Sequence, residues 1–244
     1  MMMQNHKIVL SYDGTDFHGW QRQPRRRTVQ GVLEEALAKI IHKKTCVIGA
    51  GRTDAGVHAQ GQVAHFRAHV HLQKEEFLKA LNSVLPYDVR VISWKKAAPD
   101  FHARKSARSK IYRYRLFNSP HLSPFLFRYV YQWSAPLDIP SMEKAAPLLA
   151  READFSGFSS HRGPHPVRKV FSSNLKKRGP EIVYTVEANG FLRYMVRTMM
   201  GTLLEIGRGK MSAEKIEEIF NQKNRSLAGP TAPAKGLCLI KVNY

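Results

Sequence analysis

The stretch that most constrains the fold is Gly49–Ala59, with the sequence GAGRTDAGVHA. Its three glycines allow tight turns and a close approach of the backbone to a ligand. Asp54 lies among them, two residues after the fixed cation Arg52. Strand-like runs at residues 45–48 and 62–67 flank the stretch, so we expect Asp54 on a loop held at both ends by a sheet. A rigid scaffold of this kind can present a reactive side chain.

The motif by itself leaves a plain turn open as an alternative. Asp and Gly satisfy turn geometry and local backbone donors, so most loops of this composition are only turns. Two familiar motifs are excluded. The stretch lacks the Gly-Lys-Ser/Thr ending of a phosphate-binding P-loop, and Asp54-Ala55-Gly56 has no second Asp-Thr-Gly or Asp-Ser-Gly segment with which an aspartic protease would share a proton.

The charge balance is the strongest global feature of the 244 residues. The formal net charge is +20 and the pI is about 10.2, which implies a polyanionic partner, nucleic acid before a membrane surface. No apolar run is long enough to span a bilayer and no signal peptide follows the first methionines, so we expect a cytoplasmic chain with no membrane partner. Cys46 and Cys238 lie in apolar runs and are expected to be buried thiols rather than a disulfide.

Hydrophobic periodicity predicts an irregular mixture of strands and helices along the chain. Strands are expected at residues 7–12, 45–48, 62–67, 89–94, 111–117, 167–171, 182–186 and 237–242. One helix is expected to follow Thr28 as N-cap, with apolar residues that repeat at helical spacing from Val32 to Ile41. Further helices are expected at residues 75–85, 141–150, 191–206 and 213–220. This pattern fits neither an all-α bundle nor a regular βαβ series. In the fourth helix, Arg193 and Arg197 are expected to share a face because they are four residues apart.

A second informative segment is the acid-free stretch 101–137. A period of two in its strand places Tyr112, Tyr114 and Leu116 on one face. The opposite face is basic, with Arg113 and Arg115. A solvated charged face is one explanation for these arginines, but the lack of any nearby acidic partner favours contact with phosphate.

Three features occur together in this sequence: a carboxylate framed by glycines, a strand with tyrosines and an excess of positive charge. They suggest chemistry on a single nucleotide that is flipped out of its stack. The histidines do not pair with cysteines at zinc spacing, and no Rossmann or P-loop motif is present, so we expect no metal and no cofactor. A carboxylate can act as nucleophile toward a base or its sugar, and a nearby guanidinium keeps it ionised.

The motif Gly51–Ala59 resembles the signature of the tRNA pseudouridine synthase A family. Other stretches resemble the same family in the correct order along almost the whole chain: Tyr12–Gly14 with Phe17–Gln21, Phe101–Arg104, Tyr112–Tyr114, Phe191–Arg197 and Thr231–Leu237. Agreement at all of these motifs makes Asp54 a functional residue rather than only a turn residue.

The resemblance implies that Asp54 attacks a uridine in the anticodon arm of tRNA, in the class of positions 38–40, and converts it to pseudouridine without metal or cofactor. Whether the carboxylate attacks C6 of the base or C1′ of the sugar stays open. The resemblance also implies three roles close to the reaction: Tyr112 stacks on the flipped base and could take the proton from C5, Arg197 pairs with Asp54, and Arg52 assists flipping of the nucleotide. It implies three binding roles as well: Leu237 lines the pocket, Arg104 touches phosphate, and His58 contributes to substrate binding.

The family resemblance also implies the fold class: α+β, with two similar α/β subdomains sharing a mostly antiparallel sheet and a central basic cleft. We expect residues 1–105 to carry the nucleophile loop, and residues 106–244 to carry the base-stacking strand and the arginine helix. The implied partners are the anticodon stem-loop of tRNA and a second copy in a homodimer. The loop 161–165 matches no family feature, and its role stays open.

Two rival functions remain at this point. A noncatalytic RNA-binding or ribosome-associated protein would explain the charge alone, but gives no reason for a carboxylate inside a glycine-framed loop. A synthase of the same family with another RNA position as target is the second rival.

Overall fold

A computed structural model of the chain describes residues 3–160 and 164–244. The chain divides into two compact units, residues 1–108 with 239–244 and residues 109–238. The division expected at residue 105 lies close to the first of these boundaries. The closing strand β10 (Leu237–Asn243) crosses the second boundary, so the end of the chain returns to the first unit.

Unit 1 is built on an antiparallel sheet in which β4 (Val89–Lys96), β1 (Gln4–Tyr12), β3 (His58–Ala68) and β10 follow one another in that order. The register places Gln4 opposite Ala68.

A short strand, β2 (Ile48–Gly49), pairs with β3 and leads directly into the Asp54 loop. The strand expected at residues 45–48 is therefore wrong except at its last residue, because β2 only begins at Ile48. Cys46 consequently lies in an irregular segment and is exposed, contrary to the expectation of burial, and Cys238 on β10 is intermediate.

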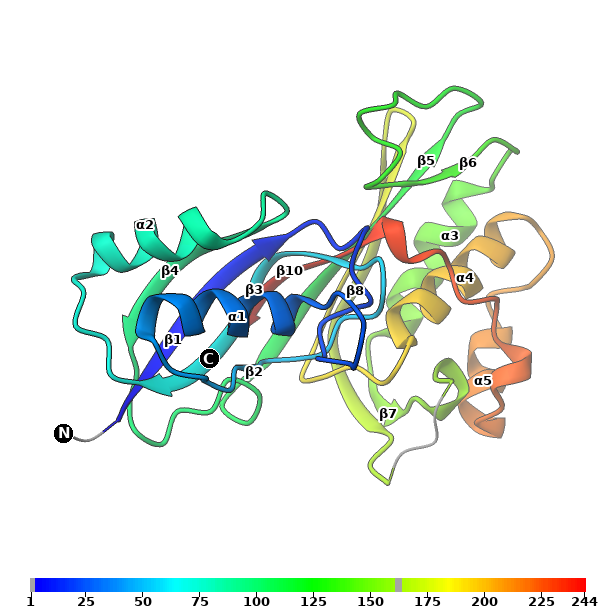
Figure 1. The fold of residues 1–244 in the computed structure, drawn as a ribbon. Coiled ribbons are helices and arrows are strands. Elements are labelled where there is room, and N and C mark those ends of the chain that lie inside the picture. Colours follow the sequence, from blue (N-terminus) through cyan, green and yellow to red (C-terminus); the bar gives the residue numbers. More distant parts are fainter. Residues whose placement is uncertain (1–2, 161–163) are drawn as a thin grey trace. The chain divides into compact units, whose positions relative to one another are not determined.

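Two helices, α1 (Val29–Ile41) and α2 (Lys74–Val84), cover one face of the unit 1 sheet (Figure 1). Thr28 caps α1 as expected, since its side chain accepts a hydrogen bond from the Gly31 N–H. The apolar residues of both helices and of β1 form the core, whose fully buried members include Ile8, Leu10, Leu33, Leu37, Phe77 and Leu81.

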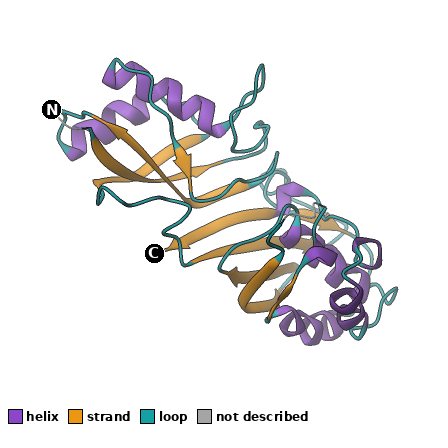
Figure 2. Cartoon of the chain, turned by 90° about the horizontal axis from the view of Figure 1, so that it is seen from below, coloured by secondary structure: helices purple, strands orange, loops and turns teal. Residues whose placement is uncertain are grey.

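Unit 2 has the same plan, with helices on one face of an antiparallel sheet (Figure 2). Its strands follow the order β5 (Ser109–Asn118), β9 (Glu181–Ala188), β8 (Val167–Arg178) and β7 (Glu152–Asp154), and β6 (Tyr131–Trp133) pairs in parallel with β5. Its elements off the sheet are α3 (Ile139–Ala145), α4 (Met195–Gly207), α5 (Lys215–Gln222), and the 3-10 turns η1 (Ala146–Leu149), η2 (Ser156–Phe158), η3 (Arg225–Leu227) and η4 (Ala234–Gly236).

The boundaries of the three unit 2 α-helices differ from the expected ones, and α5 begins and ends two residues later than the expected range 213–220. Helix α4 begins at Met195 rather than near residue 191, because Tyr194 takes the left-handed conformation with φ of 62° and interrupts the helical path. The expectation that Arg193 and Arg197 share a helix face is therefore wrong, since Arg193 precedes the helix. Helix α3 ends at Ala145 and continues as η1, where Pro147 cannot donate the helical hydrogen bond.

The strand with the tyrosines matches its expected two-faced pattern. Tyr112, Tyr114 and Leu116 are buried, whereas Arg113 is exposed and Arg115 is intermediate. The expected lack of an acidic partner is wrong for Arg115, because β9 brings Glu181 beside it and the two side chains form an ion pair. None of the helices in the described part of the chain is long and apolar enough to cross a membrane.

Candidate active site

Asp54 lies on the loop that joins β2 to β3, and its side chain is half-buried. The loop closes as a turn, because the Val57 N–H donates to the Asp54 carbonyl over 3.1 Å and Gly56 takes a φ of 77°. Strand β3 starts immediately afterwards at His58. The sheet therefore holds both ends of the loop, as the sequence predicts.

A second segment, which follows β1, braces the Asp54 loop from its other side. The Trp20 N–H donates to the Thr53 carbonyl over 3.0 Å, and the Gly56 N–H donates to the Phe17 carbonyl over 3.3 Å. The Tyr12 hydroxyl and Thr53 Oγ1 form a buried hydrogen bond of 2.8 Å. Backbone and side-chain bonds thus fix Thr53, immediately before Asp54, and Gly56, two residues after it.

Two glycines allow these segments to approach so closely. A Cβ on Gly14 would lie 2.0 Å from the Val57 carbonyl oxygen, and one on Gly19 would lie 2.6 Å from the Thr53 carbonyl oxygen. Gly19 also has a φ of 86°, which side chains disfavour. The segment that contains Gly14 and Gly19 therefore packs directly against the Asp54 loop and supports it.

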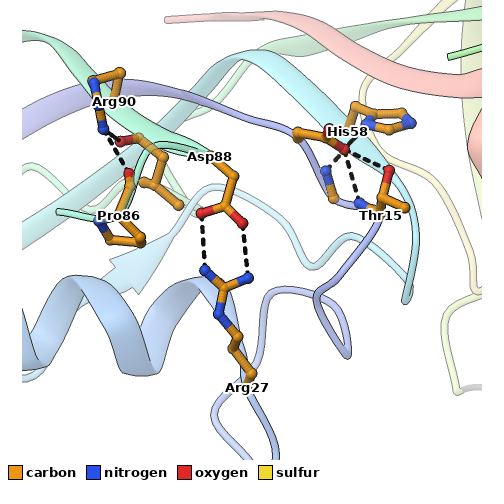
Figure 3. Close-up of polar contacts among 9 residues, drawn as sticks. Thr15, Arg27, His58, Pro86, Asp88 and Arg90 are labelled. Carbon is orange, nitrogen blue, oxygen red and sulfur yellow. Dashed lines mark hydrogen bonds and ion pairs between the residues drawn. The ribbon is translucent and has the colours of Figure 1, made fainter. Parts of the chain in front are cut away.

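His58 contacts the same segment through its imidazole ring. Its Nδ1 accepts a hydrogen bond from the Gly14 N–H over 3.1 Å and lies 3.2 Å from Asp13 Oδ1. Asp13 Oδ1 also accepts from the backbone N–H and the hydroxyl of Thr15, beside His58 in Figure 3. His58 is buried, so the structure gives it a role in the loop scaffold beside the substrate role implied by the resemblance.

Arg27 anchors the basic loop that precedes α1. Its guanidinium makes two parallel hydrogen bonds to the Asp88 carboxylate, of 2.8 and 2.9 Å (Figure 3). These bonds raise the pKa of Arg27 above its usual range. The same guanidinium lies 4.0 Å from the centroid of the Phe17 ring, so it also packs against the segment that braces the Asp54 loop.

The two exposed cations predicted in unit 1 are held in different ways. Arg52 donates from Nε to Gln21 Oε1 over 3.0 Å. Arg104 lies on the turn 102–106, where its backbone N–H donates to His102 Nδ1 over 3.2 Å. The Ala103 N–H on the same turn donates to His65 Nδ1 over 3.1 Å. Two imidazole acceptors thus shape the turn that presents Arg104.

Unit 2 carries the other three predicted site residues. Tyr112 on β5 is buried, and its ring meets the Phe191 ring edge-on with centroids 5.2 Å apart. Arg197, in the first turn of α4, donates from Nε to the Ala232 carbonyl over 2.7 Å, and its own carbonyl accepts from the Ala232 N–H. Leu237 is buried at the start of β10.

The segment 231–237 links these unit 2 residues. Arg197 holds it at Ala232, and the Tyr114 hydroxyl donates to the Pro233 carbonyl over 2.8 Å. Burial raises the pKa of Tyr114, while the nearby positive charge of Arg197 opposes that rise. Tyr114 therefore remains a neutral donor that fixes this segment. The pairing of Asp54 with Arg197 joins residues of the two units and stays a prediction.

Sequence reasoning missed the residues that support the site. Tyr114 was expected to be only a neighbour of Tyr112 on one face, and Thr53 and Gln21 were quoted only as parts of motifs. A polar residue inside an otherwise apolar or glycine-rich motif was the sequence signal that could have identified these supporting residues. The loop 161–165, whose role was left open, lies partly outside the described residues, since 161–163 are not described.

The chain is similar in sequence to a known family of enzymes. The profile of the family described as tRNA pseudouridine synthase matches residues 8–104 and 145–244. A protein named tRNA pseudouridine synthase A from Moorella thermoacetica is 44% identical over 242 residues, covering 98% of each chain. Proteins of the same name from Thermoanaerobacter sp. (43%, covering 99% of this chain and 100% of the relative) and Anoxybacillus flavithermus (44%, covering 99% of each) are similar over their full lengths.

Among solved structures, a chain of a Cbf5-Nop10-Gar1 complex matches with a TM-score of 0.35 and 10% identity, over 96% of this chain and 57% of that chain. That likeness is too weak to bear on the fold. The sequence matches are decisive by themselves because the family profile covers residues in both units and the relatives are similar over almost the whole chain. The chain belongs to the tRNA pseudouridine synthase family and is an isomerase that acts on tRNA.

Proposed function

We propose that the enzyme converts uridine to pseudouridine in the anticodon arm of tRNA, in the class of positions 38–40, with Asp54 as nucleophile. The observation that supports this most is the placement of Asp54 on a loop fixed at Thr53 and Gly56, two residues after the exposed Arg52. A nucleophile needs this kind of fixed geometry, because misplacement of a reacting group lowers the rate steeply.

The reaction is an isomerisation in which every atom stays in the nucleotide. The Asp54 carboxylate bonds to the substrate, either at C6 of the uracil or at C1′ of the ribose, and the bond between N1 and C1′ breaks. The uracil turns, C5 bonds to C1′, the proton on C5 leaves and N1 takes up a proton as the carboxylate is released. Tyr112, buried on β5, is the proposed stacking partner and proton acceptor at C5.

Arg197 and Leu237 complete the proposed pocket. A guanidinium next to Asp54 would favour the ionised carboxylate while substrate excludes water. Arg197 suits this role because its Nε is already bonded to Ala232, so its orientation is fixed before substrate arrives. Leu237, buried at the start of β10, would supply the apolar wall against the uracil ring.

The phosphate-binding surface is proposed to include the turn 102–106. Arg104 and Lys105 are exposed there, and Arg108 follows at the end of unit 1. The net charge of +20 supports a contact with several phosphates. The proposed assembly is a homodimer, as the resemblance implies, and the proposed location is the cytoplasm.

Tritium release from tRNA labelled at C5 of uridine tests the nucleophile. We expect Asp54→Asn to abolish release while tRNA binding persists, since the substitution keeps the shape of the side chain and removes only its charge and nucleophilicity. Unchanged turnover of Asp54→Asn would refute the assignment.

The target position needs a separate measurement. Pseudouridine mapping in RNA from cells with and without the protein should show loss at the anticodon-arm positions. Loss at other tRNA positions, with Asp54 still essential, would support the rival of a different target within the same family.

A further inference from the structure

We propose that Gln21, Gln30 and Glu34 form a directional hydrogen-bond relay that positions the guanidinium of Arg52 for its contact with RNA. This inference rests on the proposed function, in which Arg52 assists the flipping of the target nucleotide. Gln21, Gln30 and Glu34 are positioning residues, because they act on the substrate only through Arg52. All members belong to unit 1.

The relay runs from helix α1 to the nucleophile loop through short hydrogen bonds. Glu34 Oε1 accepts from Gln30 Nε2 over 3.0 Å. Gln30 Oε1 accepts from Gln21 Nε2 over 2.9 Å. Gln21 Oε1 then accepts from Arg52 Nε over 3.0 Å. An anionic, buried group on α1 is thereby connected to an exposed cation two residues before Asp54.

Backbone groups lock the buried end of the relay. Gln30 Nε2 also donates to the Val47 carbonyl over 3.0 Å, and Gln30 Oε1 also accepts from the Arg22 N–H over 2.9 Å. Glu34 Oε1 additionally accepts from the Val47 N–H over 3.0 Å. Gln30 and Glu34 are only 7% and 9% exposed, so a lost bond here would leave a buried polar group unpaired.

The chemistry of the partners allows only one direction for the two amides. The Glu34 carboxylate and the Val47 carbonyl can only accept, so the nitrogen of Gln30 must face them. The oxygen of Gln30 then faces Gln21, and only the nitrogen of Gln21 can meet it. The oxygen of Gln21 is thus left for Arg52, and the orientation of each amide follows from its neighbours rather than from an arbitrary choice.

This direction matters because of the shape of the guanidinium. Arginine has a planar fork of donors, and a bond at Nε leaves its two terminal nitrogens for a second partner. Arg52 is exposed, so without Gln21 its long side chain would sample many rotamers. The relay reduces that freedom before RNA arrives, and pre-ordering of a binding group raises affinity and rate.

The decisive test is a double-mutant cycle between Gln21→Met and Arg52→Ala. Methionine keeps the length of the Gln21 side chain but has no amide, and Gln21 is a half-buried loop residue whose loss should leave the fold intact. We expect Gln21→Met to lower kcat/KM for tritium release by about threefold to tenfold, the effect of losing one typical hydrogen bond at a partly solvated site. On the Arg52→Ala background the same change should have no effect.

Gln222→Met is the matched control. Gln222 is an exposed glutamine on α5 that bonds to Glu218, and its replacement should leave kcat/KM unchanged. A loss from Gln21→Met that persists on the Arg52→Ala background would overturn the proposal, as would full activity of Arg52→Ala. The proposal would also be overturned if Gln21→Met lowered the unfolding temperature enough to account for its loss of activity.

A measurement of tRNA affinity separates this inference from the assignment of the nucleophile. The same cycle, read as the Kd for tRNA on an Asp54→Asn background, reports the coupling between Gln21 and Arg52 without any turnover. Coupling in affinity with full activity of Asp54→Asn would reject the nucleophile and keep the relay. Absence of coupling in affinity, together with an inactive Asp54→Asn, would reject the relay and keep Asp54 as the nucleophile.

Discussion

At the scale of single residues, the site depends on positions where no side chain fits. Gly14 and Gly19 let the segment after β1 touch the Asp54 loop through backbone contacts that a Cβ would block. Tyr12 and His58 then bond to the same two segments from either side. Backbone packing therefore fixes the position of Asp54 in the loop.

Gly14→Ala tests this dependence. Because the new methyl group would meet the Val57 carbonyl at 2.0 Å, the loop must shift, and we expect about 1–3 kcal/mol lower stability with a loss of turnover. Urea unfolding and tritium release measure the two effects. Gly190→Ala is the control, since its Cβ would meet only Arg168 side-chain atoms at 3.6 Å and beyond. Equal activity of the two variants would contradict the role assigned to Gly14.

At the scale of elements, two strands of unit 1 carry histidines whose pKa values are lowered by burial. His6 on β1 lies between the rings of Phe66 and Trp94, with centroid distances of 5.1 and 5.4 Å. Burial lowers the pKa of His6, a trend opposed by its hydrogen bond to the Ala68 carbonyl and reinforced by Lys96. Burial likewise lowers the pKa of His65 on β3, and the neighbouring His102 adds to this effect.

The lowered pKa values predict a loss of stability in acid. The unfolded chain takes up protons on these histidines near their ordinary pKa of 6.5, whereas the native chain resists. Stability is therefore complete above pH 6.5, falls as the pH drops through that value, and levels off below the native pKa values. Urea unfolding of wild type and His6→Phe between about pH 5 and 7.5 measures this. The variant should lose stability less steeply, and identical slopes would show that His6 does not contribute.

At the scale of the whole molecule, the excess of positive charge is the property that we expect to favour tRNA binding. The net charge of +20 is too large to be balanced by internal ion pairs, since the chain has only 19 acidic residues against 39 basic ones. Some arginines are used internally, as Arg27 with Asp88 and Arg115 with Glu181. Many others are exposed, and these set the affinity for phosphate.

The salt dependence of tRNA binding tests the surface that includes the turn 102–106. Changing Arg104, Lys105 and Arg108 together to Gln should lower the steepness of log Kd against log salt by about two to three, close to one for each lost phosphate contact. Changing Lys176, Lys177 and Arg178 at the end of β8 is the control with equal charge loss. If both triple variants alter the slope equally, general charge rather than the turn determines binding.

Much of the local structure could be predicted because each prediction used only neighbouring residues. Alternation on β5 predicted the buried face of Tyr112, and Thr28 predicted the start of α1. The errors arose where a backbone conformation decided the outcome. Tyr194 in the left-handed region moved the start of α4, and the short β2 left Cys46 exposed.

The sequence by itself determined the family, the identity of the candidate nucleophile and the need for an anionic partner. These follow from residue types in order and from net charge, neither of which depends on the path of the chain. Only the tertiary structure decided what holds Asp54 in place, because Tyr12, Phe17 and Trp20 are distant from it along the sequence. The physical reason is that hydrogen bonds and steric contacts act over a few ångströms, and the fold alone brings such segments within that range.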